Sequence, residues 1–209
     1  MKGRGVRHPK QTEQNRHEVA AEAARIIATE GQRSYATAKQ KAARRLGVTN
    51  RQVLPSNVEV QAALREWQRL FGGQALADHL SALRELALEA MAFFKPFKPR
   101  LVGPVLEGTA DEFSRVCLHL FTDDPDAPVH FLMSEGIPFE QERRCIRWHR
   151  DTALDVDVLV LDKDGQLIDC TIMVGPDAKQ APPSPIDGKA MRRASIHELK
   201  TLINQPSSS

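Results

Sequence analysis

Two kinds of hydrophobic pattern divide the chain. Through residues 13–95 the apolar residues recur every three or four positions, which is the period of an amphipathic helix. In residues 96–174 they alternate with polar residues or form short continuous runs, as strands of a sheet do. The pattern predicts an α+β protein, with an N-terminal all-α helical bundle followed by a small mixed β-sheet domain.

Four helices are predicted in the first region. Their approximate ranges are 13–30, 34–46, 56–71 and 75–94. Ser56 and Glu59 match a capping box, in which each side chain bonds the backbone N–H of the other residue. Gly31 and Gly47 are typical C-terminal stops for the first two helices. Residues 1–12 carry basic side chains and no apolar period, so we expect a disordered basic arm there.

The sheet region begins at Lys95–Arg100, where two prolines end the helical pattern. Strands are expected at about 101–106, 114–122, 138–149, 153–161 and 166–174, with a short helix at about 123–136. The segment Asp162-Lys-Asp-Gly165 is typical of a hairpin turn, so the last two strands should be antiparallel neighbours. Residues 175–209 then predict a Pro-rich loop, a short helix opened by a second capping box (Ser195 and Glu198) and a polar tail.

Composition and charge narrow the class of protein. Three scattered cysteines do not match a disulfide framework or a zinc site, which favours a reducing compartment. There is no apolar run of the ~20 residues that a membrane span needs, so we expect a cytoplasmic protein without a membrane partner. Residues 1–100 hold 18 Lys+Arg and 9 Asp+Glu, a net charge of +9, and the remainder holds 11 and 18, a net charge of −7. The basic half could therefore meet a polyanion, or its charges could be solvated helix faces.

One segment of the basic half resembles a DNA-binding motif. Ala42-Ala-Arg-Arg-Leu-Gly-Val-Thr49 is similar to the first helix and turn of helix-turn-helix proteins. Pro55 limits the recognition helix that would follow to about one turn. Two interpretations stay open: a short connector within a helical bundle, or a nucleic-acid-binding surface in which Arg44, Arg45 and Arg51 contact phosphates.

The segment between Pro99 and Thr122 carries the most specific pattern. An apolar run stops at Gly108-Thr109, and a strand-like run resumes at Ser114. From there Arg115, Cys117 and His119 share one strand face. This order of elements resembles the nucleotidyltransferase superfamily.

The resemblance implies a role for each position. In that superfamily a Gly-Ser turn holds nucleotide phosphates, two aspartates on the next strand bind Mg²⁺, and a later strand supplies a third carboxylate. Gly108 and Thr109 match the phosphate-binding turn, whereas Arg115 and Cys117 stand where the two aspartates would be. Neither side chain suits Mg²⁺, which takes oxygen ligands. Asp155 or Asp157 would be the third, catalytic carboxylate.

The likeness extends over most of the chain. Together with EAARIIATEG, AKQKAARRLG and SPIDGKAMRRASIHEL, the segment RLVGPVLEGTADEFSRVCLHLF resembles an uncharacterised bacterial family described as nucleotidyltransferase-like. The resemblance implies a nucleotidyltransferase-like fold without a bound metal. Arg115 and His119 would join the turn in binding phosphate. If the two strands are neighbours, the Arg115 guanidinium would pair with Asp155 or Asp157.

Three functional hypotheses follow. The first is a catalytically degenerate pseudoenzyme that acts as a nucleotide-binding, RNA-binding or regulatory module, with a nucleotide, an RNA or a protein as partner. The second is an active nucleotidyltransferase with a rearranged Mg²⁺ site formed by Asp111, Asp155 and Asp157. The third is a nucleic-acid-binding protein that acts through the basic helical half.

Overall fold

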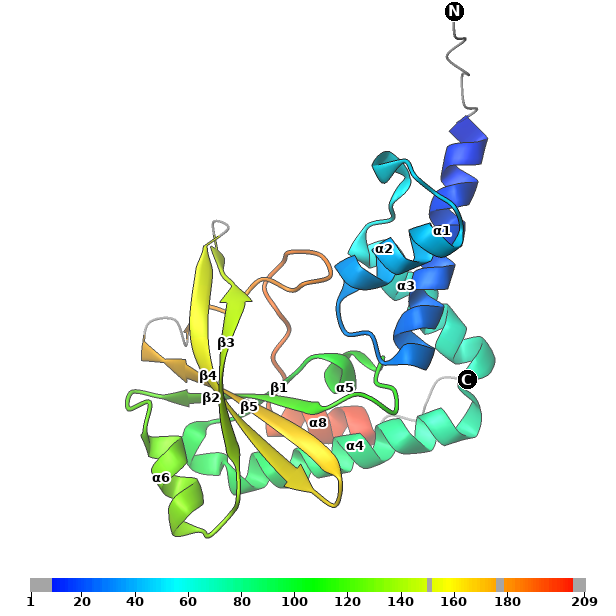
Figure 1. The fold of residues 1–209 in the computed structure, drawn as a ribbon. Coiled ribbons are helices and arrows are strands. Elements are labelled where there is room, and N and C mark those ends of the chain that lie inside the picture. Colours follow the sequence, from blue (N-terminus) through cyan, green and yellow to red (C-terminus); the bar gives the residue numbers. More distant parts are fainter. Residues whose placement is uncertain (1–8, 150–151, 176–178, 205–209) are drawn as a thin grey trace, which may run out of the picture. The chain divides into compact units, whose positions relative to one another are not determined.

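The computed structural model describes residues 9–149, 152–175 and 179–204 (Figure 1). The chain is α+β, with most helices in its first half and a five-stranded mixed sheet in its second half. It divides into two compact units. The helical unit is Met1–Gln74 with Pro185–Asp187, and the sheet unit is Ala75–Ser184 with Gly188–Ser209. Most of the expected basic arm, part of the Pro-rich loop and the end of the tail lie outside the described residues.

The helical unit is built on its first helix. Its elements are α1 (Pro9–Glu30), α2 (Tyr35–Arg45), the 3₁₀ helix η1 (Arg51–Val53) and α3 (Asn57–Phe71). α1 packs against both α2 and α3. The core at these contacts contains many small side chains, which allow the helices to approach closely: Val19, Ala20, Ala23, Ala24, Ile26, Ala38, Ala42, Val60 and Leu64.

The ends of these helices follow from local sequence. The side chain of Ser56 accepts from the Glu59 backbone N–H, and the Glu59 carboxylate accepts from the Ser56 N–H, which confirms the predicted capping box. Gly31 follows α1 with φ 62°, a left-handed conformation that suits glycine. α1 begins at Pro9, earlier than its apolar period suggests. Proline is favoured in a first helical turn because the N–H it lacks would have no partner there.

The sheet has the strand order β1-β2-β5-β4-β3. Its strands are β1 (Arg100–Val102), β2 (Val116–Thr122), β3 (Glu140–Arg147), β4 (Ala153–Lys163) and β5 (Gln166–Val174). β2 and β5 are parallel, and the other neighbouring pairs are antiparallel. The predicted hairpin between β4 and β5 is confirmed, with Asp164 and Gly165 at φ 55° and 82° in its turn.

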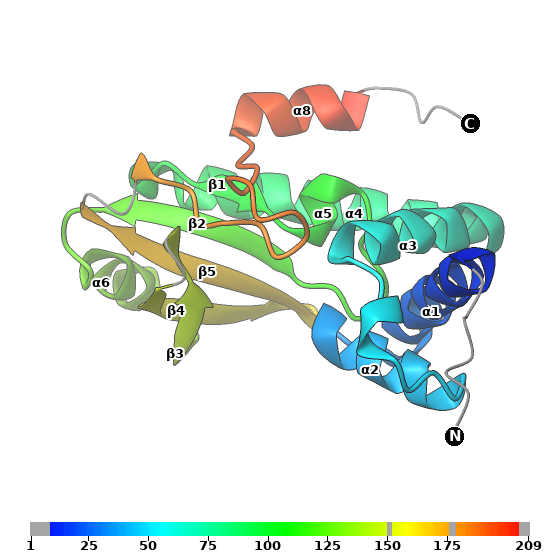
Figure 2. The same cartoon turned by 90° about the horizontal axis from the view of Figure 1, so that it is seen from above.

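The helices of the sheet unit cover one face of the sheet. They are α4 (Gly73–Phe93), the 3₁₀ helix η2 (Lys95–Phe97), α5 (Pro104–Glu107), α6 (Ala127–Ser134) and α8 (Ile196–Asn204). Figures 1 and 2 show α4 running along β2 and β5. The core between helices and sheet includes Leu83, Ala87, Met91, Phe94, Leu118, Leu120, Leu132, Leu159, Cys170 and Leu199. From Ala75 onward α4 therefore belongs to the sheet unit. The periodicity of its apolar residues instead predicts that α4 is the last helix of an N-terminal bundle over residues 13–95.

The expected strand over 101–106 is replaced by a short strand and a helical turn. β1 ends at Val102, and Pro104 opens α5. Between them Gly103 has φ 74° and lies close to Cys117, so that an added Cβ would be 3.7 Å from the Cys117 Cβ. Proline after a residue in this conformation starts a helix rather than extending the strand.

Candidate functional site

A buried carboxylate lies at the centre of the sheet face opposite α4. Asp169 is in the middle of β5, directly beside Cys117 in the parallel pair with β2. Arg115 Nη1 donates to Asp169 Oδ1 over 2.9 Å, and Arg144 Nη1 from β3 donates to Asp169 Oδ2 over 2.6 Å. Arg144 also donates to Glu142 over 2.7 Å. We call Arg115, Glu142, Arg144 and Asp169 the Asp169 cluster.

The environment of Asp169 keeps it ionised. Its exposed fraction is 5%, and this burial alone would raise the pKa of the carboxyl. The hydrogen bonds and charges of Arg144 and Arg115 outweigh the burial, and the pKa of Asp169 lies below its ordinary value. The hydrogen bond with Asp169 likewise raises the pKa of Arg144. One donor of the cluster, Arg115 Nε, is buried and has no hydrogen-bond partner among the described residues.

The two predicted catalytic aspartates lie elsewhere. Asp155 and Asp157 are on β4, whose neighbours are β3 and β5 rather than β2. Side chains alternate along a strand, so both aspartates are on the face of Leu159, which packs with α4. Asp157 Oδ1 lies 3.9 Å from Arg143 Nε at the sheet edge. The expected pairing of Arg115 with Asp155 or Asp157 is therefore replaced by its pairing with Asp169.

His119 is close to the Asp169 cluster on β2, and it is neutral. Its Nδ1 accepts a hydrogen bond of 3.1 Å from Arg193 Nε, which places the imidazole proton on Nε2. Burial and the neighbouring Arg193 lower the pKa of His119 to about 3. The Arg193 guanidinium also lies 5.0 Å from the centroid of the Phe121 ring. The positive charge beside β2 therefore comes from Arg193, and the hydrogen bond to His119 Nδ1 holds the Arg193 guanidinium in position.

The Gly108-Thr109 turn ends a helix. Gly108 has φ 73°, and its N–H bonds the carbonyl of Pro104 at the start of α5. The Thr109 N–H bonds the same carbonyl over 3.0 Å. Both amides that the resemblance assigns to phosphate are thus hydrogen-bonded inside the turn. Arg84 of α4 is next to this turn, with its Nε 3.4 Å from the Val105 carbonyl oxygen.

The side chains around Cys117 do not suit the Mg²⁺ ions that the resemblance implies. Magnesium needs several oxygen ligands in octahedral geometry. This face offers the carboxylates of Asp169 and Glu142. Both Asp169 oxygens accept from guanidinium groups, and Glu142 Oε2 accepts from Arg144. The Asp111 carboxylate accepts from the Ser114 hydroxyl and the Phe113 N–H within its own loop. In the part of the chain that the structure describes, no group of three His, Cys, Asp or Glu side chains is placed to hold a metal ion.

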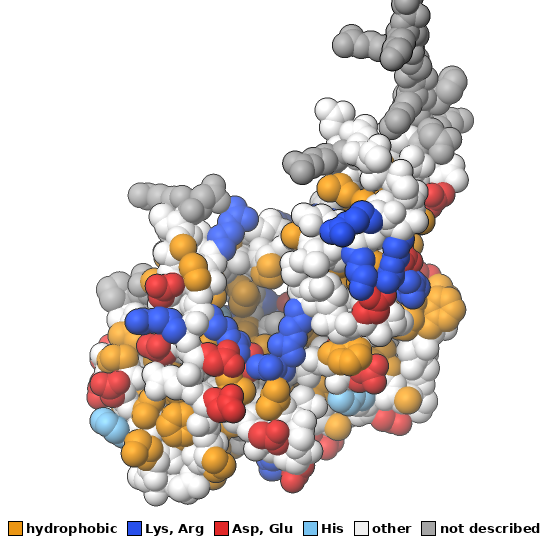
Figure 3. All heavy atoms as spheres, viewed as in Figure 1, with side chains coloured by type: hydrophobic (Ala, Val, Ile, Leu, Met, Phe, Trp, Pro, Cys, Tyr) orange, Lys and Arg blue, Asp and Glu red, His pale blue; other side chains and the backbone are white. Residues whose placement is uncertain are grey.

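The basic side chains of the helical half form an ion-pair network. Figure 3 shows Lys and Arg side chains gathered where α2 lies, with acidic side chains among them. Arg45 Nη1 is 3.0 Å from Glu22 Oε1 and 2.7 Å from Glu30 Oε1, and Lys41 also pairs with Glu30. Arg44 is exposed on the same helix. We call Glu22, Glu30, Lys41 and Arg45 the α2 network.

The segment that would supply a recognition helix is short. Arg51 begins η1, which spans three residues before Pro55, and nothing is described of its side chain. This geometry matches the connector interpretation of the segment. Of the three predicted phosphate contacts, Arg45 is bound to carboxylates of its own chain.

Four residues of the site were not predicted from sequence. Asp169, Arg144 and Glu142 complete the cluster, and Arg193 binds His119. A signal for Asp169 exists in the sequence, because it is the single charged residue within the apolar run of β5. Arg193 has no such signal, since it reaches the sheet through a bridge between Leu101 and Ala194 that the sequence pattern does not indicate.

Comparison of the chain with protein-family models, with curated proteins and with solved structures finds no match. Among the described residues, no helix is both long and apolar enough to cross a lipid bilayer.

Proposed function

We propose that this protein is a catalytically degenerate, nucleotidyltransferase-like module that binds a nucleotide or RNA without transferring a nucleotidyl group. The observation that carries the proposal is the Asp169 cluster. Cys117 stands at one of the two positions where the superfamily has an aspartate. Asp169 lies directly beside it on the neighbouring strand β5, and Arg115 and Arg144 each bind one oxygen of the Asp169 carboxylate. In this proposal the arginines neutralise the carboxylate, a role that divalent cations have in an active enzyme.

The same face offers further features for binding an anion. Arg100 pairs with His119 across β1 and β2, so its side chain is on the face of Arg193 and Asp169. Arg193 and Arg100 bring two positive charges beside the Asp169 cluster. Guanidinium groups bind phosphate through two parallel hydrogen bonds, which suits them to a nucleotide without a metal ion.

Calorimetry tests this proposal directly. The full chain would be titrated with each of the four ribonucleoside triphosphates and with a short single-stranded RNA, once with Mg²⁺ and once with EDTA. We expect saturable binding that Mg²⁺ does not strengthen, and no incorporation of labelled nucleotide into RNA or protein. Mg²⁺-dependent turnover that Asp157→Ala abolishes would instead establish the active enzyme with a rearranged carboxylate site.

A pair of matched variants locates the bound anion. Arg193→Gln removes a guanidinium from the proposed face, and Arg143→Gln removes an exposed guanidinium from the opposite face of the sheet. We expect the first to weaken nucleotide binding by about tenfold, as a lost charged hydrogen bond does, and the second to leave it unchanged. Equal losses in both variants would mean that binding is nonspecific, and the proposed face would be rejected.

A further inference from the structure

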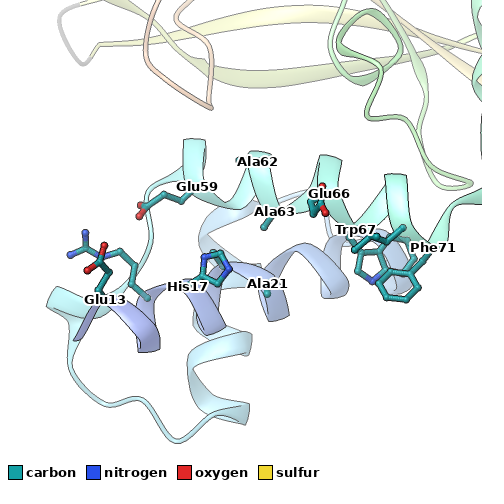
Figure 4. A pocket seen from close by; sticks show the side chains of 12 residues that line it. Glu13, His17, Ala21, Glu59, Ala62, Ala63, Glu66, Trp67 and Phe71 are labelled. Carbon is teal, nitrogen blue, oxygen red and sulfur yellow. The ribbon is translucent and has the colours of Figure 1, made fainter. Parts of the chain in front are cut away.

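A hollow lies within the helical unit, between α1 and α3 (Figure 4). Its volume is about 520 Å³. Alanines from both helices line its middle, and their small side chains leave the space open: Ala20, Ala21, Ala62 and Ala63. All of its lining residues belong to the helical unit, whereas the Asp169 cluster belongs to the sheet unit.

Large apolar side chains gather at one end of the groove. The rings of Trp67 and Phe71 contact each other with centroids 5.5 Å apart, and Figure 4 shows them together at this end. Phe71 is 68% exposed and Leu70 is 56% exposed. Exposed aromatic groups beside an apolar groove are typical of a surface that a partner covers, and aromatic anchors dominate the energy of many interfaces.

The charges along the groove are mostly acidic. Glu13, Glu59 and Glu66 line it, against one guanidinium, that of Arg16. Hydrogen bonds from Ser56 lower the pKa of Glu59, and a hydrogen bond from Arg69 lowers the pKa of Glu66, so both are ionised at neutral pH. An otherwise basic half of the chain therefore presents an acidic border at this groove.

The groove is elongated. Its lining on α3 extends from Glu59 to Phe71, which at about 1.5 Å per residue corresponds to roughly 18 Å. This length matches about three turns of a helix and exceeds the size of most small ligands. Two helices side by side also form the usual receptor for an amphipathic helix, whose apolar side chains enter between them.

We propose that the groove between α1 and α3 docks an amphipathic helix of a partner protein, with its apolar face against Trp67 and Phe71 and with Lys or Arg along its flanks. The apolar face of that helix covers the exposed ring of Phe71 and the accessible part of the half-buried Trp67. Its basic flanks meet the carboxylates of Glu13 and Glu59, whereas Glu66 is already paired with Arg69.

The test uses designed peptides as probes. Two fluorescent helical peptides share one leucine face, and one carries lysine on its flanks while the other carries glutamate. A third peptide has the lysine composition in scrambled order. In fluorescence anisotropy with the full chain, we expect saturable binding of the lysine peptide and binding at least about tenfold weaker for the other two.

Matched variants separate this groove from other surfaces. Phe71→Ala should weaken binding of the lysine peptide about tenfold, whereas Met133→Ala, which removes a similarly exposed side chain from α6, should not change it. Glu13→Lys should remove most of the preference for the lysine peptide over the glutamate peptide, because two cations would then face two carboxylates along the groove. Equal binding of the scrambled peptide, or no saturable binding, would overturn the proposal. Self-association of the chain that Phe71→Ala abolishes, without peptide binding, would also overturn it and assign the groove to a second copy.

Discussion

The Asp169 cluster and the α2 network use the same chemistry in different surroundings. In both, arginine side chains bind carboxylates over 2.6–3.0 Å. The Asp169 side chain is 7% exposed, whereas the carboxylate side chains of Glu22 and Glu30 in the α2 network are 18% and 28% exposed. Water screens the exposed pairs, and each charge there can be solvated if its partner is lost. A buried charge that loses its partner stays desolvated, so the two networks should respond very differently to mutation.

The largest effect is expected from the buried carboxylate. Asp169→Asn leaves Arg115 and Arg144 without their shared anion, and loss of a buried partner of this kind costs about 3 kcal/mol of the free energy of unfolding. Urea unfolding of the full chain measures this loss. Asp157→Asn is the control, because Asp157 is a half-exposed carboxylate whose nearest guanidinium is 3.9 Å away. Equal destabilisation by both variants would contradict the distinction between buried and exposed pairs.

A smaller effect is expected from the buried imidazole. The pKa of His119 is about 3 in the folded chain and near 6.5 in an unfolded one, so the unfolded state binds the additional proton as the pH falls below 6.5. This group alone should lower the free energy of unfolding by about 2 kcal/mol between pH 7 and pH 5. His119→Asn keeps an acceptor for Arg193 and should remove that part of the pH dependence.

The exposed His130 provides the control for this measurement. His130→Asn should leave the pH dependence of unfolding as it is in the parent chain. Proton NMR offers an independent measurement, in which the His119 ring resonances should stay constant as the pH falls from 7 to 5. A titration midpoint near pH 6.5 would show that the imidazole is not buried and neutral.

The smallest effect is expected from the α2 network. Arg45→Gln removes the pairs with Glu22 and Glu30 at an exposed position, so we expect no measurable change in the free energy of unfolding. Melting curves at low and high salt check this, because any contribution of these pairs should disappear as the ionic strength rises. A loss as large as that of Asp169→Asn would show that the α2 network is as important to stability as the buried cluster.

Local features were predictable from the sequence. The capping boxes at Ser56 and Ser195 and the hairpin turn before Gly165 depend on neighbouring residues, and all three form as predicted. Strand alternation also placed Cys117 and His119 on one face of β2 correctly, since Cys117 lies beside Asp169 and His119 beside Thr171.

Contacts between distant segments were not predictable in the same way. A strand pattern tells which side chains share a face, but it does not tell which strand becomes the neighbour. β2 pairs with β5 instead of β4, and for this reason Asp169 rather than Asp155 or Asp157 meets Arg115. Likewise, the apolar stripe of α4 predicts that the helix is covered without indicating whether a helix or a sheet covers it.

The parallel pairing of β2 with β5 also constrains the order of assembly. Arg115 and Asp169 are separated by 54 positions, and α6, β3 and β4 are synthesised between them. Until β5 has been made, one edge of β2 lacks its neighbour, and Arg115 and Arg144 have no shared counter-ion. Closing so long a loop is slow compared with forming the β4–β5 hairpin. The ionic contact between Arg115 and Asp169 can therefore form only when the β4–β5 hairpin, which closes more quickly, docks against β2.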